Sequence, residues 1–365
     1  MPAIRAAVCS AAGAPLEVRE LQLDEPHEGE VLVRLRATGV CHSDLSAVDG
    51  AIASRFPVVV GHEGAGVVEA VGPSVRRVLP GDHVVLSWVA TCRRCFWCTH
   101  GQPQLCLSGV RHNGAMDDGT TRLRLAGEPV YHGIDVAAFA EATVVRETAV
   151  VPIDASTPFE RAALAGCAVT TGVGAVVRTA DVRPGERVVV VGCGGVGLSA
   201  VQGARLAGAS LIVAVDPVEA RREAALRLGA THALDPTDGL PKAIKGMTDG
   251  IGADAVLECA GRSELQRLAW DLTRRGGRTV LVGLPAATAE TTFPGLLLTI
   301  WERQIRGSFY GSCDPQRDIP WILELAEAGR LDLDALISQR ITLADVDDAL
   351  AAMRRGEQLR SVVAF

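Results

Sequence analysis

The chain has 365 residues, of which 48% are hydrophobic and 22% charged, and its formal net charge is −7 at pH 7. This length predicts two or three domains with sizeable buried cores. The acidic balance, which no block of consecutive Lys or Arg residues offsets, argues against a nucleic-acid-binding surface, and no apolar run of about 18 residues is present to span a membrane.

The first third of the chain predicts short strands. Residues 30–37 alternate polar and apolar side chains, as a half-buried strand does. Residues 58–60, 66–71 and 83–86 are β-branched runs separated by Gly and Pro. This spacing indicates a Greek-key or barrel-like lobe.

From about Pro158 onward, strands alternate with helical segments, which predicts βαβ units and a parallel sheet. The apolar run at 187–192 is typical of a strand buried on both faces. Further strands are predicted at 211–216, 255–259, 279–283, 305–308 and 361–365, and helices at 195–209 and 219–229.

A glycine-rich segment follows the strand at 187–192 directly and opens the next helix. Its residues are Gly192, Gly194, Gly195, Val196 and Gly197, in the pattern G-x-G-x-x-G. In this context the pattern predicts a dinucleotide site, because the glycines allow the backbone to approach a pyrophosphate and the helix N-terminus offers it unpaired N–H groups.

Asp216 ends the strand after this segment, nineteen positions beyond Gly197. A carboxylate there accepts hydrogen bonds from the adenosine ribose hydroxyls and repels a 2′-phosphate. We therefore expect NAD rather than NADP as the cofactor.

Four of the ten cysteines lie close together: Cys92, Cys95, Cys98 and Cys106, spaced C-x2-C-x2-C-x7-C. Four thiolates so near one another can surround one tetrahedral Zn²⁺ and leave no open position, which indicates a structural metal. An iron–sulfur cluster is the alternative, because it also takes four cysteines.

A second set is dispersed along the chain and consists of Cys41, His62 and Cys167. Each alone has a simple explanation, because Cys is often a small buried hydrophobe and a lone His is usually a core residue. The neighbours of two of them make the set a candidate ligand set, because Cys41 lies in the segment CHSD at 41–44 and His62 in GHEG at 61–64.

The whole chain resembles the zinc-containing medium-chain alcohol dehydrogenases. The matching segments are GVCHSD at 39–44, GHEGAG at 61–66, the four clustered cysteines, GCAVTTG at 166–172, GCGGVG at 192–197 and LRSVVAF at 359–365. The resemblance implies an α/β fold in which a Rossmann domain is inserted into a GroES-like β-barrel catalytic domain. The implied boundaries are 1–168 with 310–365 for the catalytic domain, a structural zinc lobe at 88–110, and 169–309 for the NAD-binding domain.

The resemblance also implies an NAD-dependent enzyme with two zinc ions per subunit. Cys41, His62 and Cys167 would hold the catalytic zinc, and the four clustered cysteines the structural zinc. Glu63 would lie behind the catalytic metal, Asp44 would orient the His62 ring, and Ser43 would take the proton of the alcohol. His42 and Arg360 would contact the pyrophosphate, Thr171 the nicotinamide, Asp216 and Arg221 the adenosine ribose, and Trp88 and Leu284 the substrate.

Two departures from the family pattern bear on the substrate. Ser46 stands where many relatives end the proton relay with a histidine, so water, the cofactor ribose or His42 would end it here. The segment 114–123 is similar to the longer-loop dimeric members, which include glutathione-dependent formaldehyde dehydrogenases. Ile52 and Val110 occupy the positions that bind the thiol adduct there, although Arg111 is one step away. We therefore expect an apolar or aromatic alcohol.

The sequence leaves several hypotheses about function open. A thiol-dependent formaldehyde dehydrogenase, using mycothiol or glutathione, is one alternative. A nicotinoprotein that keeps its NAD is a second, and a nucleotide-binding sensor without catalysis is a third. We further expect a cytoplasmic homodimer, since the N-terminus shows no apolar segment before a cleavage site and the loop resembles that of dimeric members.

Overall fold

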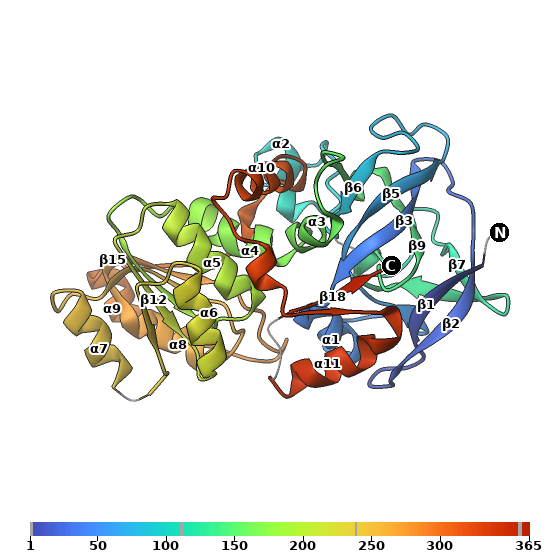
Figure 1. Ribbon diagram of the computed structural model, residues 1–365. Helices are drawn as coiled ribbons and strands as arrows, with labels where there is room; N and C mark the ends of the chain where they lie inside the picture. Colours follow the sequence, from blue (N-terminus) through green and yellow to red (C-terminus); the bar gives the residue numbers. More distant parts are fainter. Residues whose placement is uncertain (1–2, 110–112, 238, 357–359) are drawn as a thin grey trace. The chain divides into compact units, whose positions relative to one another are not determined.

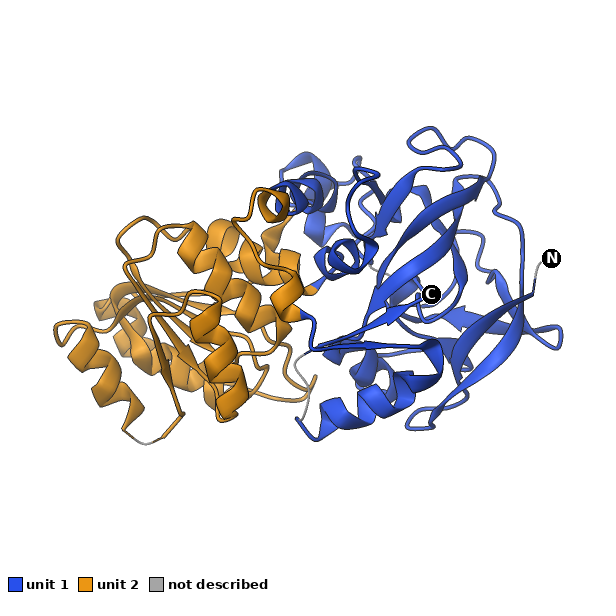
Figure 2. Ribbon diagram, viewed as in Figure 1, with its two compact units in different colours: residues 1–167, 314–324, 337–365 blue, residues 168–313, 325–336 orange. Residues whose placement is uncertain are grey.

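The computed structural model describes residues 3–109, 113–237, 239–356 and 360–365 (Figure 1). They form two compact units, shown in different colours in Figure 2. Unit 1 comprises Met1–Cys167, Asp314–Glu324 and Ile337–Phe365, and unit 2 comprises Ala168–Cys313 and Leu325–Leu336.

The segment Leu325–Leu336 groups with unit 2, whereas the sequence prediction assigned it to the catalytic domain. The reason is a reciprocal side-chain contact. The amide of Gln202 donates to the Asp332 carbonyl at 3.1 Å and accepts from the Asp332 N–H at 2.7 Å. Because Gln202 is buried, these two hydrogen bonds hold the segment against unit 2. No spacing or periodicity in the sequence predicts this contact.

Unit 1 is rich in short strands, as predicted. The strands are β1 (Ala3–Cys9), β2 (Leu16–Leu23), β3 (Glu30–Gly39), β4 (Val58–Val59), β5 (Glu63–Val71), β6 (His83–Leu86), β7 (Leu123–Leu125), β8 (Glu128–His132), β9 (Ala142–Arg146), β10 (Val150–Pro152), β17 (Gln339–Ile341) and β18 (Ser361–Ala364). The helices are α1 (His42–Val48), α2 (Phe96–Thr99), α3 (Phe159–Ala165), α10 (Pro315–Glu327) and α11 (Val346–Arg354).

These strands build a closed barrel and a larger sheet, which confirms the predicted GroES-like lobe. The barrel runs β1-β2-β7-β8-β4, and the sheet runs β10-β6-β5-β3-β18-β17 with β9 also paired to β3. The C-terminal strand β18 pairs antiparallel with β3, Val362 facing Gly39. The far end of the chain is thereby brought beside the segment that leads into α1.

Unit 2 is an open parallel sheet with helices between its strands. The strands are β11 (Arg187–Val191), β12 (Leu211–Val215), β13 (His232–Leu234), β14 (Ala253–Glu258), β15 (Thr273–Leu281) and β16 (Gln304–Gly307). The helices are α4 (Ala168–Gly174), α5 (Gly195–Leu206), α6 (Glu219–Arg227), α7 (Leu240–Met247), α8 (Ser263–Leu272) and α9 (Gly295–Ile300).

The strand order is β13-β12-β11-β14-β15-β16, with all pairs parallel. The order reverses between β11 and β14. Right-handed crossovers therefore place α5 and α6 on one face of the sheet and α7 and α8 on the other. The core of the sheet consists mainly of Val, Ile, Leu and Ala side chains, as expected for strands buried on both faces. The predicted Rossmann architecture is confirmed.

Among the described residues, no single helix is both long and apolar enough to cross a membrane. The bent pair Phe159–Ala165 and Ala168–Ala180 reaches that length and composition only when the two helices are taken together.

Candidate metal centres and nucleotide site

Asp44 organises the start of α1 and the residues around it. Cys41 is the N-cap of this helix, and its N–H donates to Asp44 Oδ2 at 3.0 Å. The other carboxylate oxygen, Oδ1, accepts from the Gly61 N–H at 3.0 Å and lies 2.7 Å from His62 Nδ1. The fully buried Asp44 carboxylate thus fixes the backbone at Cys41 and next to His62, and it also orients the His62 ring.

The chain needs glycine immediately before His62. Gly61 has a positive φ of 93°, and a Cβ on it would lie 2.5 Å from the Phe139 backbone nitrogen. This close approach lets the N–H groups of Ala138 and Phe139 bond to the carbonyls of Gly61 and Val60. These hydrogen bonds therefore fix the backbone at His62, the residue immediately before β5.

Four side chains from three parts of unit 1 converge on one point. The ligand atoms of Cys41, His62, Glu63 and Cys167 all lie within 4.8 Å of one another, and all four residues are buried. The buried His62 Nε2 has no nitrogen or oxygen partner among the described residues, and besides Asp44 the ring interacts with the Cys41 sulfur. A buried nitrogen without a partner is costly, and a metal ion would satisfy it.

The donor chemistry fits zinc. Two cysteines and one histidine form the ligand set known for the catalytic zinc of alcohol dehydrogenases. The Cys167 thiol donates to the Cys41 sulfur and holds the pKa of Cys41 well below its usual range, against the effect of burial. Burial works against a charged His62 ring, but the Asp44 carboxylate raises the pKa of His62 well above its ordinary value. When the ring gives up one proton to bind a metal, Asp44 keeps the remaining proton on Nδ1 and leaves the Nε2 lone pair for the ion.

Glu63 and Arg360 form a buried ion pair at the same point. The Arg360 guanidinium donates to Glu63 Oε2, and both residues are buried. A Cβ on Gly39 would lie 2.1 Å from that oxygen, so glycine at this position makes room for the carboxylate. Burial raises the pKa of Glu63 to about 7, although the charge of Arg360 opposes the shift. The sequence resemblance assigned Arg360 to a pyrophosphate and did not anticipate this pairing across 297 positions.

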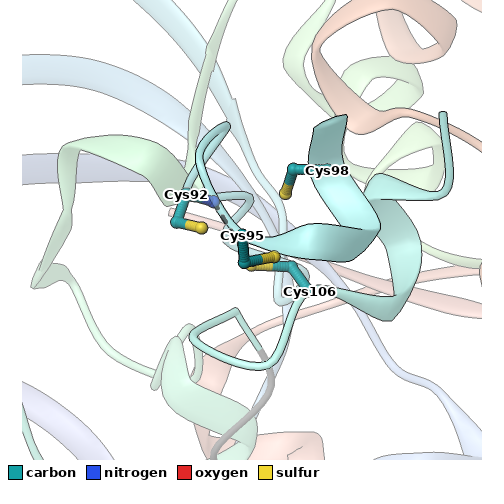
Figure 3. A group of neighbouring side chains, drawn as sticks. All are labelled: Cys92, Cys95, Cys98 and Cys106. Atoms are coloured by element: carbon teal, nitrogen blue, oxygen red, sulfur yellow. Dashed lines mark hydrogen bonds between the residues drawn. The ribbon is translucent and has the colours of Figure 1, made fainter. Parts of the chain in front are cut away.

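The four clustered cysteines form a second site, which we call the four-cysteine lobe (Cys92, Cys95, Cys98 and Cys106). Their sulfurs lie within 4.8 Å of one another, and Figure 3 shows them gathered around one point. The sulfurs of Cys95 and Cys106 are 3.8 Å apart. A tetrahedral ion with Zn–S bonds of about 2.3 Å places its sulfurs about 3.8 Å apart. An iron–sulfur cluster would need a wider cage, because each thiolate would bind a different iron atom. The geometry favours a single tetrahedral zinc.

Backbone N–H groups support the sulfurs of the four-cysteine lobe. The Cys92 N–H donates to Cys106 Sγ at 3.3 Å. Burial works against the Cys92 thiolate, but the N–H groups of Arg94 and Cys95 lower the pKa of Cys92 to about 6. No position in this ligand set is left for a substrate, so the lobe suits a structural metal.

In unit 2, the glycine-rich segment has the form that a phosphate site requires. Gly192 has φ of 91°, and a Cβ on Gly197 would lie 1.8 Å from the Gly192 carbonyl oxygen, so both positions demand glycine for the fold itself. Gly194 differs, because a Cβ there would meet nothing within 4 Å and its φ is −74°. Packing does not explain this glycine, whereas close approach of a pyrophosphate does. The segment also lies at the strand-order reversal, where such sheets bind ligands.

Asp216 lies one residue beyond β12 and is buried. Its Oδ2 accepts from the Cys193 N–H at 2.8 Å and its Oδ1 from the Val218 N–H at 2.9 Å. Each carboxylate oxygen can accept a second donor, so ribose hydroxyls can still bind. Arg221 Nη1 lies 3.9 Å from Oδ2. Burial raises the pKa of Cys193 to about 12, in keeping with an inert side chain in the loop.

The remaining predicted residues are placed as follows. The Trp88 and His62 rings meet edge to face, 6.3 Å between centroids. His42 is exposed and Ser43 half-buried in the first turn of α1, and Thr171 is buried in α4. Leu284 lies in unit 2 and is 68% exposed. Ile52 is half-buried against the barrel core, and Val110 and Arg111 lie outside the described residues.

Comparison with known proteins identifies the two halves of the chain. The family described as alcohol dehydrogenase GroES-like domain matches residues 27–155, and the family described as zinc-binding dehydrogenase matches residues 195–328. The NDMA-dependent alcohol dehydrogenase of Amycolatopsis methanolica is 40% identical over 363 residues, which cover 98% of each chain. The S-(hydroxymethyl)glutathione dehydrogenase of Paracoccus denitrificans is 39% identical and covers 99% of each.

The solved structures give the same result. The crystal structure of benzyl alcohol dehydrogenase from Acinetobacter calcoaceticus is similar with a TM-score of 0.94 and 34% identity, covering 100% of both chains. These likenesses extend over nearly the whole chain and therefore over both units. The chain therefore belongs to the family of zinc-containing medium-chain alcohol dehydrogenases.

Proposed function

We propose that this protein is an NAD-dependent zinc alcohol dehydrogenase that reversibly oxidises an apolar or aromatic primary or secondary alcohol to the aldehyde or ketone. The main support is the convergence of Cys41, His62 and Cys167 around a buried His62 Nε2 that has no nitrogen or oxygen partner among the described residues. Zinc analysis together with an NAD-linked assay over a panel of alcohols tests it. Absence of zinc, or absence of turnover on every alcohol and aldehyde, would contradict it.

The chain's own residues supply orientation, charge and a proton path. Zinc, when bound, supplies a Lewis acid that lowers the pKa of a bound hydroxyl and polarises a carbonyl. Asp44 holds the His62 ring in one tautomer, and Arg360 offsets the charge of Glu63. To the Ser43 hydroxyl, in the first turn of α1 after Cys41, we assign the role of accepting the alcohol proton and passing it towards solvent.

Replacement of Ser43 tests that role. The variant Ser43→Ala should lower turnover by about a hundredfold, the order expected for loss of one positioned proton-transfer group. The affinity for NAD should stay unchanged, because the Ser43 hydroxyl acts only on the substrate proton. Unchanged turnover would remove Ser43 from the mechanism.

Gly194 offers a sharp test of the dinucleotide site. Because a Cβ at Gly194 meets nothing within 4 Å, Gly194→Ala should fold normally yet raise the KM for NAD by about tenfold or more, through collision with the pyrophosphate. Gly246→Ala is the matched control, since a Cβ there also meets nothing and Gly246 lies in α7, away from the glycine-rich segment. Equal KM values for the two variants would contradict the placement. A strong preference for NADP would contradict the role proposed for Asp216.

The half-buried Trp88 beside His62, and Ile52 in place of an acidic residue, favour apolar or aromatic alcohols. The similar structure of a benzyl alcohol dehydrogenase supports this preference. The relative named S-(hydroxymethyl)glutathione dehydrogenase favours a thiol adduct instead. Steady-state kinetics on benzylic and short-chain alcohols, and on formaldehyde with glutathione or mycothiol, would separate the two classes.

The NDMA-dependent relative supports a variant of the proposal in which NAD stays bound and an external acceptor reoxidises it. The absorbance spectrum of the purified protein distinguishes the two modes. Appearance of a reduced-nicotinamide band on adding alcohol alone, without added NAD, identifies the nicotinoprotein. We also propose a cytoplasmic homodimer, and size-exclusion chromatography with light scattering would check the subunit number.

A further inference from the structure

Arg93 lies inside the four-cysteine lobe, between the ligands Cys92 and Cys95. It is not glycine, yet its φ is 62°, in the left-handed region that most residues avoid. Its guanidinium makes two hydrogen bonds to Asp314, from Nη1 to Oδ2 and from Nη2 to Oδ1, each 2.6 Å long. The contacts around this residue therefore hold it in a conformation that it would not otherwise favour.

The partner, Asp314, comes from the other end of unit 1. It is the first residue of the segment Asp314–Glu324, which returns to unit 1 after unit 2. Asp314 Oδ1 also accepts from the Gln316 N–H at 3.1 Å. Gln316 in turn bonds to the Val150 carbonyl at 2.9 Å and accepts from Arg77 at 2.5 Å. The contacts of Gln316 thus fix the position of Asp314, and only 15% of the Asp314 side chain is exposed.

Arg93 also contacts the ligands themselves. Its backbone N–H bonds to the Cys98 sulfur, as the N–H groups of Arg94 and Cys95 bond to Cys92. The backbone conformation of Arg93 consequently sets the direction of the N–H that bonds to the Cys98 sulfur. The Arg93 side chain fixes that conformation through its bonds to Asp314. Four thiolates around one divalent cation carry a net charge of −2, which a neighbouring guanidinium offsets.

We propose that Asp314 and Arg93 act together as positioning residues for the metal site of the four-cysteine lobe. Asp314 holds Arg93 in the conformation that presents Cys92, Cys95 and Cys98 to one ion, and so slows loss of the metal. An exposed ion pair by itself adds little stability, but here two parallel bonds fix a geometry. This inference concerns metal retention alone and does not depend on the cofactor or substrate proposed above.

Coupling of this kind is reciprocal. If docking of the segment Asp314–Glu324 favours metal binding, metal binding favours docking of that segment to the same degree. Removal of the lobe metal should therefore raise amide exchange at the start of α10, about 220 positions away in the sequence.

The rate of zinc release tests the proposal. The protein with both zinc ions is mixed with excess 4-(2-pyridylazo)resorcinol, and the phase that belongs to the four-cysteine lobe is assigned by its absence in Cys106→Ser. The variants are Arg93→Gln, Asp314→Asn, both together, and Arg93→Lys. Asp314→Asn keeps an oxygen that can accept from Gln316. Arg94→Gln is the matched control, because it removes an exposed charge from the same loop and keeps the backbone N–H that bonds to Cys92.

Arg93→Gln and Asp314→Asn should each release the lobe zinc about tenfold faster, the effect expected when a residue that orients a ligand is lost. The double variant should be no faster than either single one, because both remove the same interaction. Arg93→Lys should be intermediate, since an ammonium cannot make the paired bonds. Arg94→Gln and the other zinc phase should not change. In wild-type protein, loss of the lobe zinc should raise the rate of amide exchange at residues 314–318. In Arg93→Gln, loss of the lobe zinc should raise that rate less.

Three results would overturn the proposal: an unchanged lobe phase in both single variants, equal acceleration in Arg94→Gln, or equal acceleration of both zinc phases. The first would show that Asp314 is a surface partner only, the second a general effect of charge, and the third a global loosening of unit 1. If Arg93→Gln does not fold, Asp314→Asn and Arg93→Lys decide the matter by themselves.

Discussion

The two cysteine clusters of unit 1 hold their sulfurs in different ways. The four-cysteine lobe takes all its ligands from fifteen consecutive residues, and backbone N–H groups of the same loop bond to its sulfurs. The buried cluster takes its ligand atoms from three separate parts of unit 1, and side chains hold them: Asp44 on His62 and Arg360 on Glu63. A local loop can close around a metal, whereas distant elements can leave one side of it open.

We therefore expect the four-cysteine lobe to contribute to stability and the buried cluster to carry the chemistry. Loss of a sulfur in the four-cysteine lobe should loosen a surface loop and leave the reactive centre intact. Loss of a ligand in the buried cluster should abolish the reaction while the barrel and the parallel sheet persist, because their cores are large and apolar. The predictions below test this separation, beginning with the largest expected effect.

Cys41→Ser should reduce alcohol oxidation by at least about a thousandfold, since several kcal/mol of Lewis-acid stabilisation are lost and each 1.36 kcal/mol is a factor of ten. Zinc should fall from two ions per chain to one, and NAD should still bind. Zinc analysis, turnover and NADH fluorescence titration measure the three quantities. Residual turnover above a tenth of wild type would remove Cys41 from the metal site.

Asp44→Asn should weaken zinc binding at the buried cluster by about 10- to 100-fold, because the amide no longer holds the Nδ1 proton of His62 as a carboxylate does. The four-cysteine lobe should keep its zinc. Competition with a chelator of known affinity measures both sites. If both sites weaken to the same extent, the effect is a general loss of structure and Asp44 has no specific role.

Cys106→Ser should leave the turnover of the folded protein within about threefold of wild type, but lower its thermal midpoint by about 10 °C, corresponding to loss of a few kcal/mol of metal-linked stability. Zinc should fall from two ions to one. Differential scanning calorimetry and initial rates on freshly purified protein check both effects. A loss of turnover as large as that in Cys41→Ser would make the distinction between the clusters wrong.

The same contrast explains which parts of the site could be predicted from sequence. The spacing of Cys92, Cys95, Cys98 and Cys106 indicates a metal by itself, because ligands within one short loop must lie close together. The glycine-rich segment is equally local, and its neighbours β11 and α5 begin within a residue of their predicted positions. Periodicity also predicted the parallel sheet and the β-rich lobe.

The dispersed ligands needed more than spacing. No local pattern brings Cys41, His62 and Cys167 together, and only the resemblance to a family implied it. The Glu63–Arg360 pair and the Gln202–Asp332 contact were missed altogether, because each joins residues more than a hundred positions apart through tertiary packing alone. Such contacts leave no periodicity, and for that reason spacing alone could not indicate that Leu325–Leu336 groups with unit 2.

The smallest expected effect concerns the acid stability of the barrel beside the buried cluster. His132 ends β8 and pairs with Val59 of β4, the strand that precedes Gly61 and His62. Burial, together with the charge of Arg122, lowers the pKa of His132 to about 3, whereas a histidine in the unfolded chain titrates near 6.5. Below pH 6.5 the unfolded state therefore binds a proton that the native state does not.

His132 thus favours folding fully above pH 6.5, and this contribution is lost at up to about 1.4 kcal/mol per pH unit as the pH falls towards 3. His132→Gln keeps an acceptor for the Arg122 N–H and cannot titrate, so its free energy of unfolding should decline less steeply between pH 6.5 and 4.5. Protonation of the metal ligands is common to both proteins and cancels in the difference. Urea unfolding at several pH values measures the slopes, with His232→Gln, an exposed histidine in unit 2, as the control. Parallel slopes for wild type and His132→Gln would contradict the low pKa of His132 in the folded barrel.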